Sequence, residues 1–267
     1  MINIKVLKDC AEVSYEIPGR KKQIKVIGIS DIPGLFDSKI LFDSGMLPVF
    51  GTENSYGIQR IIQKDNQMIV FVQGINPFVN MLHTECSDLD ENARELLGIG
   101  SIKTAFSEYT KKHEEGATCY KNVYLPNLLM SVQLKKDSKD CWKVHNTGLL
   151  CYKDHFISDQ TQLYKFPFSN IYRGSTYGSI CWGSENPVAS SAGQAVALIH
   201  SFLGAIMNTH LFDPIKIKGY EIQCSSELLA YLSLRSEDIN CFPYEDINLS
   251  KVIKYNDLIS YLNQNWK

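Results

Sequence analysis

One segment of this chain alternates apolar and polar side chains with a period of two residues. Its apolar positions are Leu128, Met130, Val132 and Leu134. Successive side chains of a β-strand point to opposite faces, so the pattern predicts a strand with one buried face. Segments at 123–125, 142–152 and 163–166 predict further strands, the second of them interrupted at 146–148. A polar turn at 135–140 separates the alternating segment from the strand predicted at 142–152. Strands joined by short turns favour an antiparallel meander.

Helical periodicity comes before and after these strands. Over 89–112, apolar residues recur every three or four positions, which predicts a helix. A second pattern of this kind lies within 186–212, a stretch that contains no charged residue. Asn186 is placed to cap that helix, and Pro187 suits its first turn. Two short helices are expected near the end of the chain, at 226–235 and 255–266.

The uncharged stretch is not expected to cross a membrane. A spanning helix needs about 20 mostly apolar residues. Polar side chains interrupt this stretch at Gln194, His200, Ser201, Asn208 and His210. We therefore expect a helix buried in the protein. The formal net charge of −2, from 27 Lys plus Arg against 29 Asp plus Glu, gives no electrostatic reason to expect nucleic acid as a partner.

The order of the predicted elements defines an α+β chain of 267 residues. A helix, antiparallel strands, an irregular loop and a buried helix follow one another from about residue 89. The earlier part is β-rich, with alternating runs between residues 4 and 26 and an apolar run at 68–72. We predict a main domain at 89–267. Residues 1–88 are either a separate β-rich module or an extension of the same sheet.

Eight cysteines bear on compartment and on metal binding. No two form a CxxC pair, and the metal-like run at 83–86 lacks a second pair of ligands, so we predict neither a metal site nor a cofactor. The N-terminus shows no long apolar leader region. Disulfide frameworks are typical of short secreted chains, so we expect a cytoplasmic protein with reduced, mostly buried thiols. The cysteines are Cys10, Cys86, Cys119, Cys141, Cys151, Cys181, Cys224 and Cys241.

One of the eight, Cys181, has a different setting. It occupies a loop rich in glycine and serine, at 170–184, shortly before the predicted start of a helix. Surface loops often carry function, and exposed N–H groups at a helix start favour a thiolate. Cys181 is therefore the candidate nucleophile, and Trp182 is expected to pack beneath the loop. The alternative is a buried thiol with a structural role.

The loop sequence resembles the active-site stretch of ubiquitin-conjugating enzymes. That family has His-Pro-Asn, an apolar residue, a short turn and then Gly-x-Ile-Cys. The matching runs here are 170–172 and 178–181. Phe168 and Ser169 stand where the family has His and Pro, and the turn is longer by a few residues. The resemblance implies a ubiquitin-conjugating-enzyme-like antiparallel meander with flanking helices over about residues 90–215.

These departures are similar to those of a bacterial branch of the superfamily. The branch is prokaryotic conjugating-enzyme family D, which includes protein B of the PRTRC plasmid-type cassettes. Its members lack the His of His-Pro-Asn and carry a His downstream of the cysteine in a Thr-His context, which Thr209 and His210 match. The Cys-Trp-Gly run at 181–183 also resembles this branch. A weaker similarity extends toward the N-terminus.

The resemblance implies a transferase with Cys181 as its nucleophile. The cysteine would accept the C-terminus of a ubiquitin-like protein as a thioester from an adenylating activating enzyme, and pass it to an amine. Asn170 would stabilise the oxyanion or hold the loop, unless it is an ordinary turn asparagine. His210 would act as a base or orient the loop, unless it is a structural residue at a helix end. A metal-dependent deconjugating peptidase from the same operon is a further implied partner.

Two other functions compete with this one. The missing His-Pro pair favours a catalytically silent relative that binds a ubiquitin-like protein as a scaffold. An unrelated cysteine hydrolase needs Cys, His and an orienting group, a set that Cys181, His210 and Asp213 can supply. Neither a GxxxxGK[ST] phosphate loop nor a GxSxG elbow occurs in the sequence. Tyr172 and Tyr177 are candidates to shape a groove for an extended tail.

Overall fold

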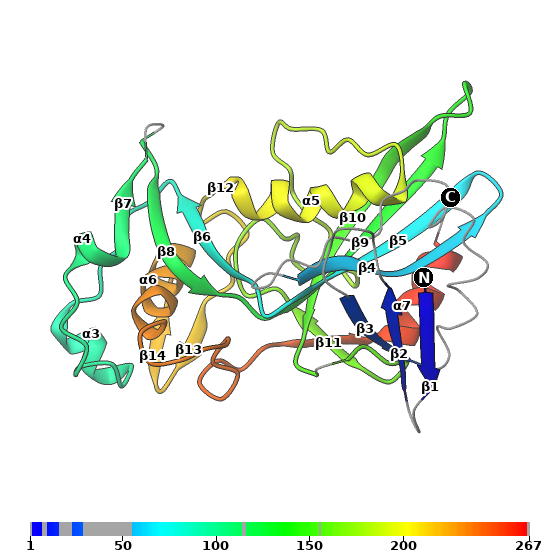
Figure 1. Ribbon diagram of the computed structural model, residues 1–267. Helices are drawn as coiled ribbons and strands as arrows, with labels where there is room; N and C mark the ends of the chain where they lie inside the picture. The colour runs from blue at the N-terminus through cyan, green and yellow to red at the C-terminus, as the bar shows by residue number, and fades with distance from the viewer. Residues whose placement is uncertain are drawn as a thin grey trace.

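The computed structural model describes residues 2–6, 10–15, 23–28, 55–113, 116–154 and 156–265. Its strands are mostly antiparallel and its helices few, so the chain is α+β, as predicted (Figure 1). The largest unit is a six-stranded sheet in the order β15-β11-β10-β9-β5-β4. Its strands are β4 (Ser55–Lys64), β5 (Gln67–Ile75), β9 (Asn127–Lys136), β10 (Trp142–Tyr152), β11 (Gln162–Lys165) and β15 (Lys251–Lys254).

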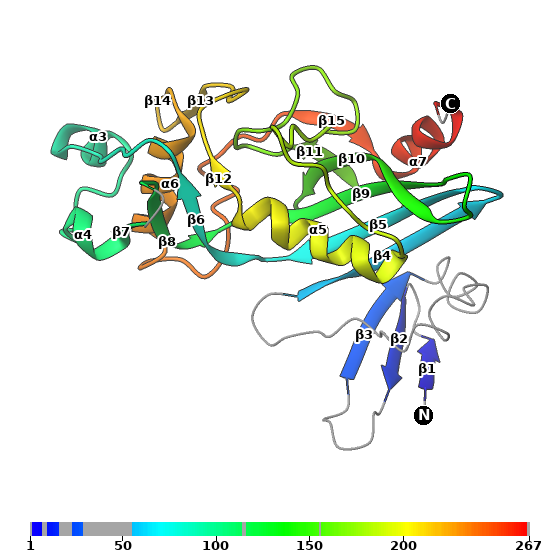
Figure 2. The same cartoon turned by 90° about the horizontal axis from the view of Figure 1, so that it is seen from above.

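The alternating segment forms β9, near the centre of this sheet. β9 pairs antiparallel with β5 and β10, and Val132 lies opposite both Val70 and Thr147. The predicted strand is confirmed, but the expectation of a single buried face is wrong, because helices cover both faces. The alternating apolar residues join the core beneath α5 (Ala192–Gly204), whereas Leu129 joins the core beneath α7 (Tyr255–Gln264). The two helices thus lie on opposite faces of the sheet (Figure 2).

A second, four-stranded sheet has the order β12-β6-β8-β7, with β12 parallel to β6. The prediction of a single helix over 89–112 is wrong. Two short helices, α3 (Glu91–Leu96) and α4 (Phe106–Tyr109), share this segment with a strand. Gly98 follows α3 with φ +73°, a left-handed conformation that ends a helix. The strands of this sheet are β6 (Phe78–His83), β7 (Thr110–Lys112), β8 (Thr118–Tyr124) and β12 (Ile206–Met207).

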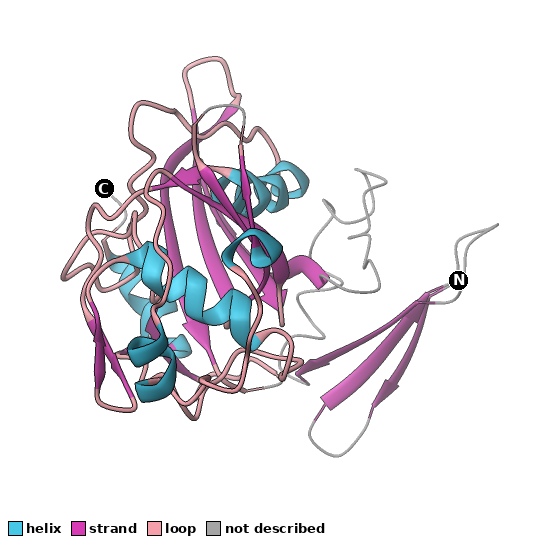
Figure 3. Ribbon diagram, turned by 90° about the vertical axis from the view of Figure 1, so that its left-hand side faces the viewer, coloured by secondary structure: helices cyan, strands magenta, loops and turns pink. Residues whose placement is uncertain are grey.

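Strands from the first 88 residues contribute to both sheets. β4 and β5 belong to the main sheet, and β6 belongs to the second. Of the two alternatives for this segment, residues 55–83 match an extension of the sheet, while the boundary at residue 88 stays a prediction. The three strands expected near the N-terminus form a further antiparallel sheet (Figure 3): β1 (Ile2–Val6), β2 (Cys10–Tyr15) and β3 (Gln23–Gly28).

The long uncharged stretch forms α5, which begins later than predicted. Its N-cap is Ser191, whose Oγ accepts a hydrogen bond from the Gln194 N–H at 3.2 Å. The capping roles predicted for Asn186 and Pro187 are therefore wrong. Across the described ranges, no helix is long and apolar enough to cross a membrane. After α5 the chain continues through β13 (Ile215–Ile217), β14 (Tyr220–Ile222) and α6 (Ser225–Arg235).

Candidate active site

The loop at 170–184 that contains Cys181, called the cysteine loop below, lies alongside β10. β10 pairs with β11 at residues 150–151, and the loop takes the place of β11 along the preceding residues of β10. The Leu149 N–H donates to the Gly178 carbonyl at 2.8 Å. The Ile180 N–H donates to the Thr147 carbonyl at 3.1 Å. The segment that leads into the candidate nucleophile therefore continues the sheet, and main-chain hydrogen bonds hold it against β10.

Two glycines make this close approach possible. Gly178 has φ +67°, and a Cβ atom added there would lie 2.1 Å from the Leu149 carbonyl oxygen. A Cβ atom on Gly148 would lie 2.2 Å from the Tyr177 carbonyl oxygen. A larger residue at either position must push the loop and β10 apart.

Two short stretches of the loop, 170–172 and 179–181, pair with each other next to the candidate nucleophile. Ile171 and Ile180 form an antiparallel bridge, and both side chains are buried. One residue further, the Tyr172 N–H donates to the Ser179 carbonyl at 2.9 Å. Side chains alternate between the two faces of paired strands. Because the isoleucines face the core, Tyr172 and Cys181 face outward, where Tyr172 is 49% exposed and Cys181 is half-buried.

Main-chain hydrogen bonds bring the three predicted site residues together. The Cys181 N–H donates to the Asn170 carbonyl at 2.7 Å, and the Asn170 N–H donates to the His210 carbonyl at 3.2 Å. Asn170 has φ +65°, a conformation that asparagine tolerates in turns. Among the residues the structure describes, no side-chain hydrogen bond joins Asn170 or His210 to the thiol. The residues lie close together, and the roles predicted for their side chains stay predictions.

Two expectations that depended on helix ends are wrong. α5 begins at Ala192, so Cys181 is not next to a helix start. α5 ends at Gly204, and His210 lies in an exposed turn after β12 rather than at the end of a helix. The effect of a helix dipole falls off within the first or last turn. The chemistry of the site therefore depends on contacts within the loops.

Tyr172 interacts with the candidate nucleophile. A hydrogen bond and a charge interaction with Cys181 raise the pKa of the Tyr172 hydroxyl. A neutral phenol can donate a hydrogen bond to a sulfur, and a hydrogen bond to a charged acceptor is stronger than one to a neutral acceptor. Sequence reasoning considered Tyr172 only as part of a groove. The alternation of side chains over 171–172 and 179–181 is the signal that points to its contact with the thiol.

Removing the Tyr172 hydroxyl is expected to slow the alkylation of Cys181 by iodoacetamide at neutral pH. Because the pair faces solvent, we expect Tyr172→Phe to slow the reaction by about 3-fold. The rate is followed by mass spectrometry of the peptide that contains Cys181. Tyr124→Phe is the matched control, since Tyr124 belongs to β8 of the second sheet and not to the loop that contains Cys181. Equal rates in the wild type and Tyr172→Phe would show that the hydroxyl does not act on the sulfur.

Tyr177 and Trp182 hold the loop in place. The Tyr177 hydroxyl accepts a hydrogen bond from the Asn146 Nδ2 at 2.7 Å. The Trp182 Nε1 donates to the Thr147 Oγ1 at 2.7 Å, and the Trp182 ring centre lies 5.9 Å from that of Phe202 in α5. Trp182 therefore bonds to β10 and packs against α5, while Tyr177 fastens the loop to β10. The prediction that Trp182 packs beneath the loop stays a prediction.

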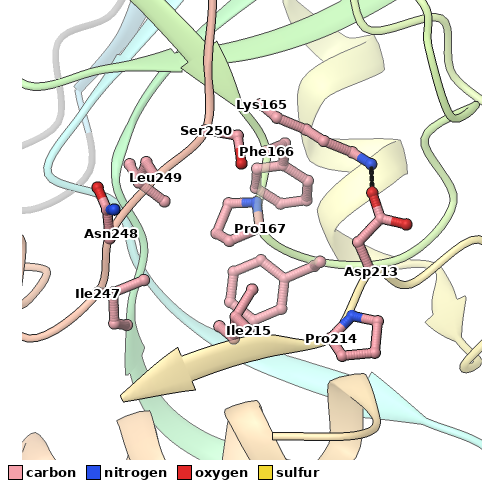
Figure 4. Close-up of a pocket in the computed structure, with 11 residues that line it drawn as sticks. Lys165, Phe166, Pro167, Asp213, Pro214, Ile215, Ile247, Asn248, Leu249 and Ser250 are labelled. Carbon is pink, nitrogen blue, oxygen red and sulfur yellow. Dashed lines mark hydrogen bonds and ion pairs between the residues drawn. The ribbon is translucent and has the colours of Figure 1, made fainter. Parts of the chain in front are cut away.

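The carboxylate of Asp213 is engaged by two cations. Lys165 Nζ contacts its Oδ2, and Arg173 Nε lies 2.8 Å from its Oδ1. Figure 4 shows the Lys165–Asp213 pair at the edge of a cavity. Arg173 also donates to the Phe212 carbonyl at 2.7 Å, which ties the cysteine loop to the segment after α5. These contacts oppose a hydrolase triad, in which Asp213 would have to orient His210.

The cavity in Figure 4 is small and does not include the nucleophile. Its volume is about 60 Å³, and Cys181 is not among the residues that line it, which fall within 165–168, 213–215 and 247–250. Small-molecule sites in proteins occupy roughly 300–1,000 Å³. The cavity is too small for such a ligand.

The metal-like run at 83–86 has other contacts. His83 is fully buried, its Nδ1 accepts a hydrogen bond from the Glu85 N–H at 2.9 Å, and its Nε2 lies 2.7 Å from the Ser225 Oγ. Both ring nitrogens are therefore occupied by protein groups. Over the described part of the chain, no group of three His, Cys, Asp or Glu residues is placed to hold a metal ion.

The expectation of mostly buried thiols is wrong. Seven cysteines lie in the described ranges with their side chains, and all seven are free. Of these seven, only Cys151 is buried, whereas Cys86, Cys141 and Cys241 are exposed. Exposure therefore does not distinguish Cys181 from the other thiols. What distinguishes Cys181 is its interaction with Tyr172 and its place in the paired segments of the loop.

Buried His83 is expected to make the protein less stable in mild acid. Burial lowers the pKa of His83 from 6.5, although Glu85 partly opposes this. The unfolded chain takes up a proton near pH 6.5 while the folded protein resists it, so stability falls as the pH drops from 6.5 toward the folded pKa. We expect a lower urea midpoint at about pH 5.5 than at about pH 7.5, and a smaller difference in His83→Gln. An identical difference in both proteins would exclude His83 as the cause.

No protein-family model, curated protein or solved structure matches this chain. The resemblance to conjugating enzymes therefore depends on the loop residues and on the order of the elements. Fold alone does not define function, which depends on the residues of the site.

Proposed function

We propose that this protein is a ubiquitin-like-protein conjugating enzyme. Cys181 accepts the C-terminus of a ubiquitin-like protein as a thioester from an adenylating activating enzyme, and passes it to an amine. The observation that carries the proposal is the pair of main-chain hydrogen bonds from Cys181 to Asn170 and from Asn170 to His210. It supports the proposal because a nucleophile, an oxyanion donor and a base have to lie within reach of one reacting carbonyl.

The order of elements also supports the proposal. The antiparallel strands β9, β10 and β11 precede the cysteine loop, and α5 follows it and packs on the main sheet. This is the order that the family resemblance implies. We accordingly propose a ubiquitin-conjugating-enzyme-like fold of the bacterial family D type, in which β4, β5 and the second sheet are additions to the meander.

The proposed reaction has two transfer steps. In the first, the Cys181 thiolate attacks the thioester carbonyl of the carrier, and the thiolate of the activating enzyme leaves. In the second, an amine attacks the Cys181 thioester, an amide bond forms, the Cys181 thiolate leaves and the amine loses a proton. The side-chain amide of Asn170 stabilises the oxyanion in each step. His210 takes the proton from the amine.

The partners follow from this chemistry. They are the ubiquitin-like carrier, the activating enzyme and a metal-dependent deconjugating peptidase encoded in the same operon. The transfer itself uses no cofactor, because the activating enzyme has already converted the carrier into a thioester. We place the reaction in the cytoplasm, where reducing conditions keep exposed thiols such as Cys86 and Cys241 free.

One observation favours a second function. Phe168 and Ser169 stand at the His-Pro positions of the family resemblance, and both side chains are buried. Neither can present a polar group to the outer face where Cys181 lies. A relative without this pair could bind a ubiquitin-like protein as a scaffold and form no thioester.

Mixing the protein with the activating enzyme, the ubiquitin-like protein and ATP separates the two functions. A conjugating enzyme forms an adduct that a thiol reductant removes. A scaffold retains the ubiquitin-like protein in a binding assay but forms no adduct. Binding without an adduct overturns the proposed enzyme in favour of the scaffold, and the absence of both rejects the two together.

A further inference from the structure

A chain of hydrogen bonds connects the protein interior to the candidate active site. It begins at His83, the buried last residue of β6, whose Nε2 lies 2.7 Å from the Ser225 Oγ. Ser225 is the first residue of α6 and is also fully buried, and its hydroxyl donates to the Asn208 carbonyl at 3.1 Å. The Asn208 Oδ1 accepts a hydrogen bond from the His210 N–H at 2.7 Å. The buried Ser225 thus fixes the main chain of Asn208, and the side chain of Asn208 fixes the main chain of His210 at the surface.

The amide hydrogen of Glu85 sets the direction of these bonds. It points at the His83 Nδ1 over 2.9 Å, so Nδ1 accepts and the ring proton resides on Nε2, which donates to the Ser225 Oγ. The Glu85 carbonyl lies 3.2 Å from the same Nδ1 and could accept a hydrogen bond if Nδ1 carried the proton. The contact with the Glu85 N–H is shorter, and the peptide plane fixes the position of its hydrogen, so this contact decides the tautomer. In this tautomer His83 cannot take a proton from Ser225, so the pair is not a catalytic dyad.

Beyond His210, the series of hydrogen bonds continues to Cys181. The His210 carbonyl accepts from the Asn170 N–H, and the Asn170 carbonyl accepts from the Cys181 N–H. A second contact ties this segment to the residues that follow β6, because the Thr209 Oγ1 donates to the exposed Glu85 Oε2, two residues after His83. The segment that carries His210 is therefore fastened on both sides of its turn.

We infer that His83, Ser225 and Asn208 are positioning residues for the Cys181 site. The inference rests on the proposed function of that site. Residues 208–211 form no helix or strand of their own, so their place depends on these hydrogen bonds. A displacement of about 1 Å at a reacting group can slow a reaction by about 100-fold. Loosening Asn208 is therefore expected to reduce the rate of transfer without changing which partners bind.

Ser225→Ala and Asn208→Ala test the inference, with Ser233→Ala as the matched control. Ser233 is also a buried serine of α6, and it donates to the carbonyls of Tyr109 and Lys121 rather than to the site. Ser225→Ala leaves a buried donor unpaired on His83 and can impair folding. Asn208 is exposed, so Asn208→Ala breaks the same chain with little effect on folding.

We expect both test variants to form the Cys181 thioester about 10-fold more slowly, at an unchanged half-saturating concentration of the carrier. Ser233→Ala is expected to stay within about twofold of the wild type, as for a change remote from the reacting groups. Asn208→Asp keeps an acceptor oxygen for the His210 N–H, so it is expected to restore most of the rate. Equal slowing in Ser225→Ala and Ser233→Ala, or an unchanged rate in Asn208→Ala, would overturn the inference.

Amide hydrogen exchange provides a readout that does not depend on conjugation. We expect the amides of Asn170 and Cys181 to exchange faster in Ser225→Ala and Asn208→Ala than in Ser233→Ala. If the wild type forms no thioester, the proposed function fails and these exchange rates still decide whether the three residues hold the loop. Unchanged exchange in both test variants would reject the positioning role even if the thioester forms.

Discussion

Cys181→Ser is expected to replace a reductant-sensitive adduct with a reductant-resistant one, and Cys181→Ala is expected to form none. The serine hydroxyl can still attack the activated carrier, but more slowly, because a hydroxyl is a much weaker nucleophile than a thiolate. The oxygen ester that results is less reactive toward amines and thiols, so the carrier accumulates on the protein. Gel electrophoresis with and without reductant, followed by intact-protein mass spectrometry, detects the change. Mild alkali is expected to release the carrier from Cys181→Ser.

Other exposed thiols provide the control for this experiment. Cys141 and Cys241 are free and exposed, as a competing acceptor thiol would be. Cys141→Ala and Cys241→Ala are therefore expected to form the adduct at the wild-type rate. An adduct that persists in Cys181→Ala would contradict the assignment of the nucleophile and would direct the search to these thiols.

Gly178→Ala is expected to destabilise the protein far more than Gly174→Ala. Both glycines have positive φ, +67° for Gly178 and +74° for Gly174, so both substitutions incur the strain of a left-handed alanine. That strain costs about 1–2 kcal/mol. At Gly174 the new Cβ meets nothing within 4 Å, whereas at Gly178 it would lie 2.1 Å from the Leu149 carbonyl oxygen. The difference between the two variants isolates the close approach of the loop to β10.

Urea unfolding measures this pair of variants. We expect Gly174→Ala to lower the free energy of unfolding by about 1 kcal/mol, and Gly178→Ala by about 3 kcal/mol or more. Alkylation of Cys181 is expected to change only in Gly178→Ala, because only that substitution moves the paired segment that leads to the thiol. Equal losses of stability in the two variants would mean that the loop has room to move away from β10 without penalty.

Local periodicity made much of the fold predictable. The alternation at 128–134 identifies β9, and the apolar spacing near the end of the chain places α6 and α7. The same reasoning failed over 89–112, where helical spacing continues past Gly98. There the left-handed glycine ends α3, and pairing of 110–112 with β8 makes a strand of residues that local spacing assigns to a helix.

The candidate site was predictable only in part. The loop composition and the motif around Cys181 identify the candidate nucleophile and point to Asn170 and His210. The predicted influence of helix ends on Cys181 and His210 was wrong, since it depended on helix bounds, which local signals define poorly. The contact between Tyr172 and Cys181 follows from the pairing of Ile171 with Ile180, and the alternation along the two stretches points to it only once that pairing is known.

By itself, the sequence determined the α+β class and the positions of most strands, and it made Cys181 the candidate among eight cysteines. Each of these depends on a pattern among a few neighbouring residues, and such local patterns specify strands, helices and short motifs directly. Only the tertiary structure decided which residues surround the candidate nucleophile. His83 and Ser225 lie 142 residues apart in the chain and meet because β6 and the start of α6 pack together. Burial and hydrogen bonding between such distant residues depend on the complete arrangement of the elements, which no local pattern contains.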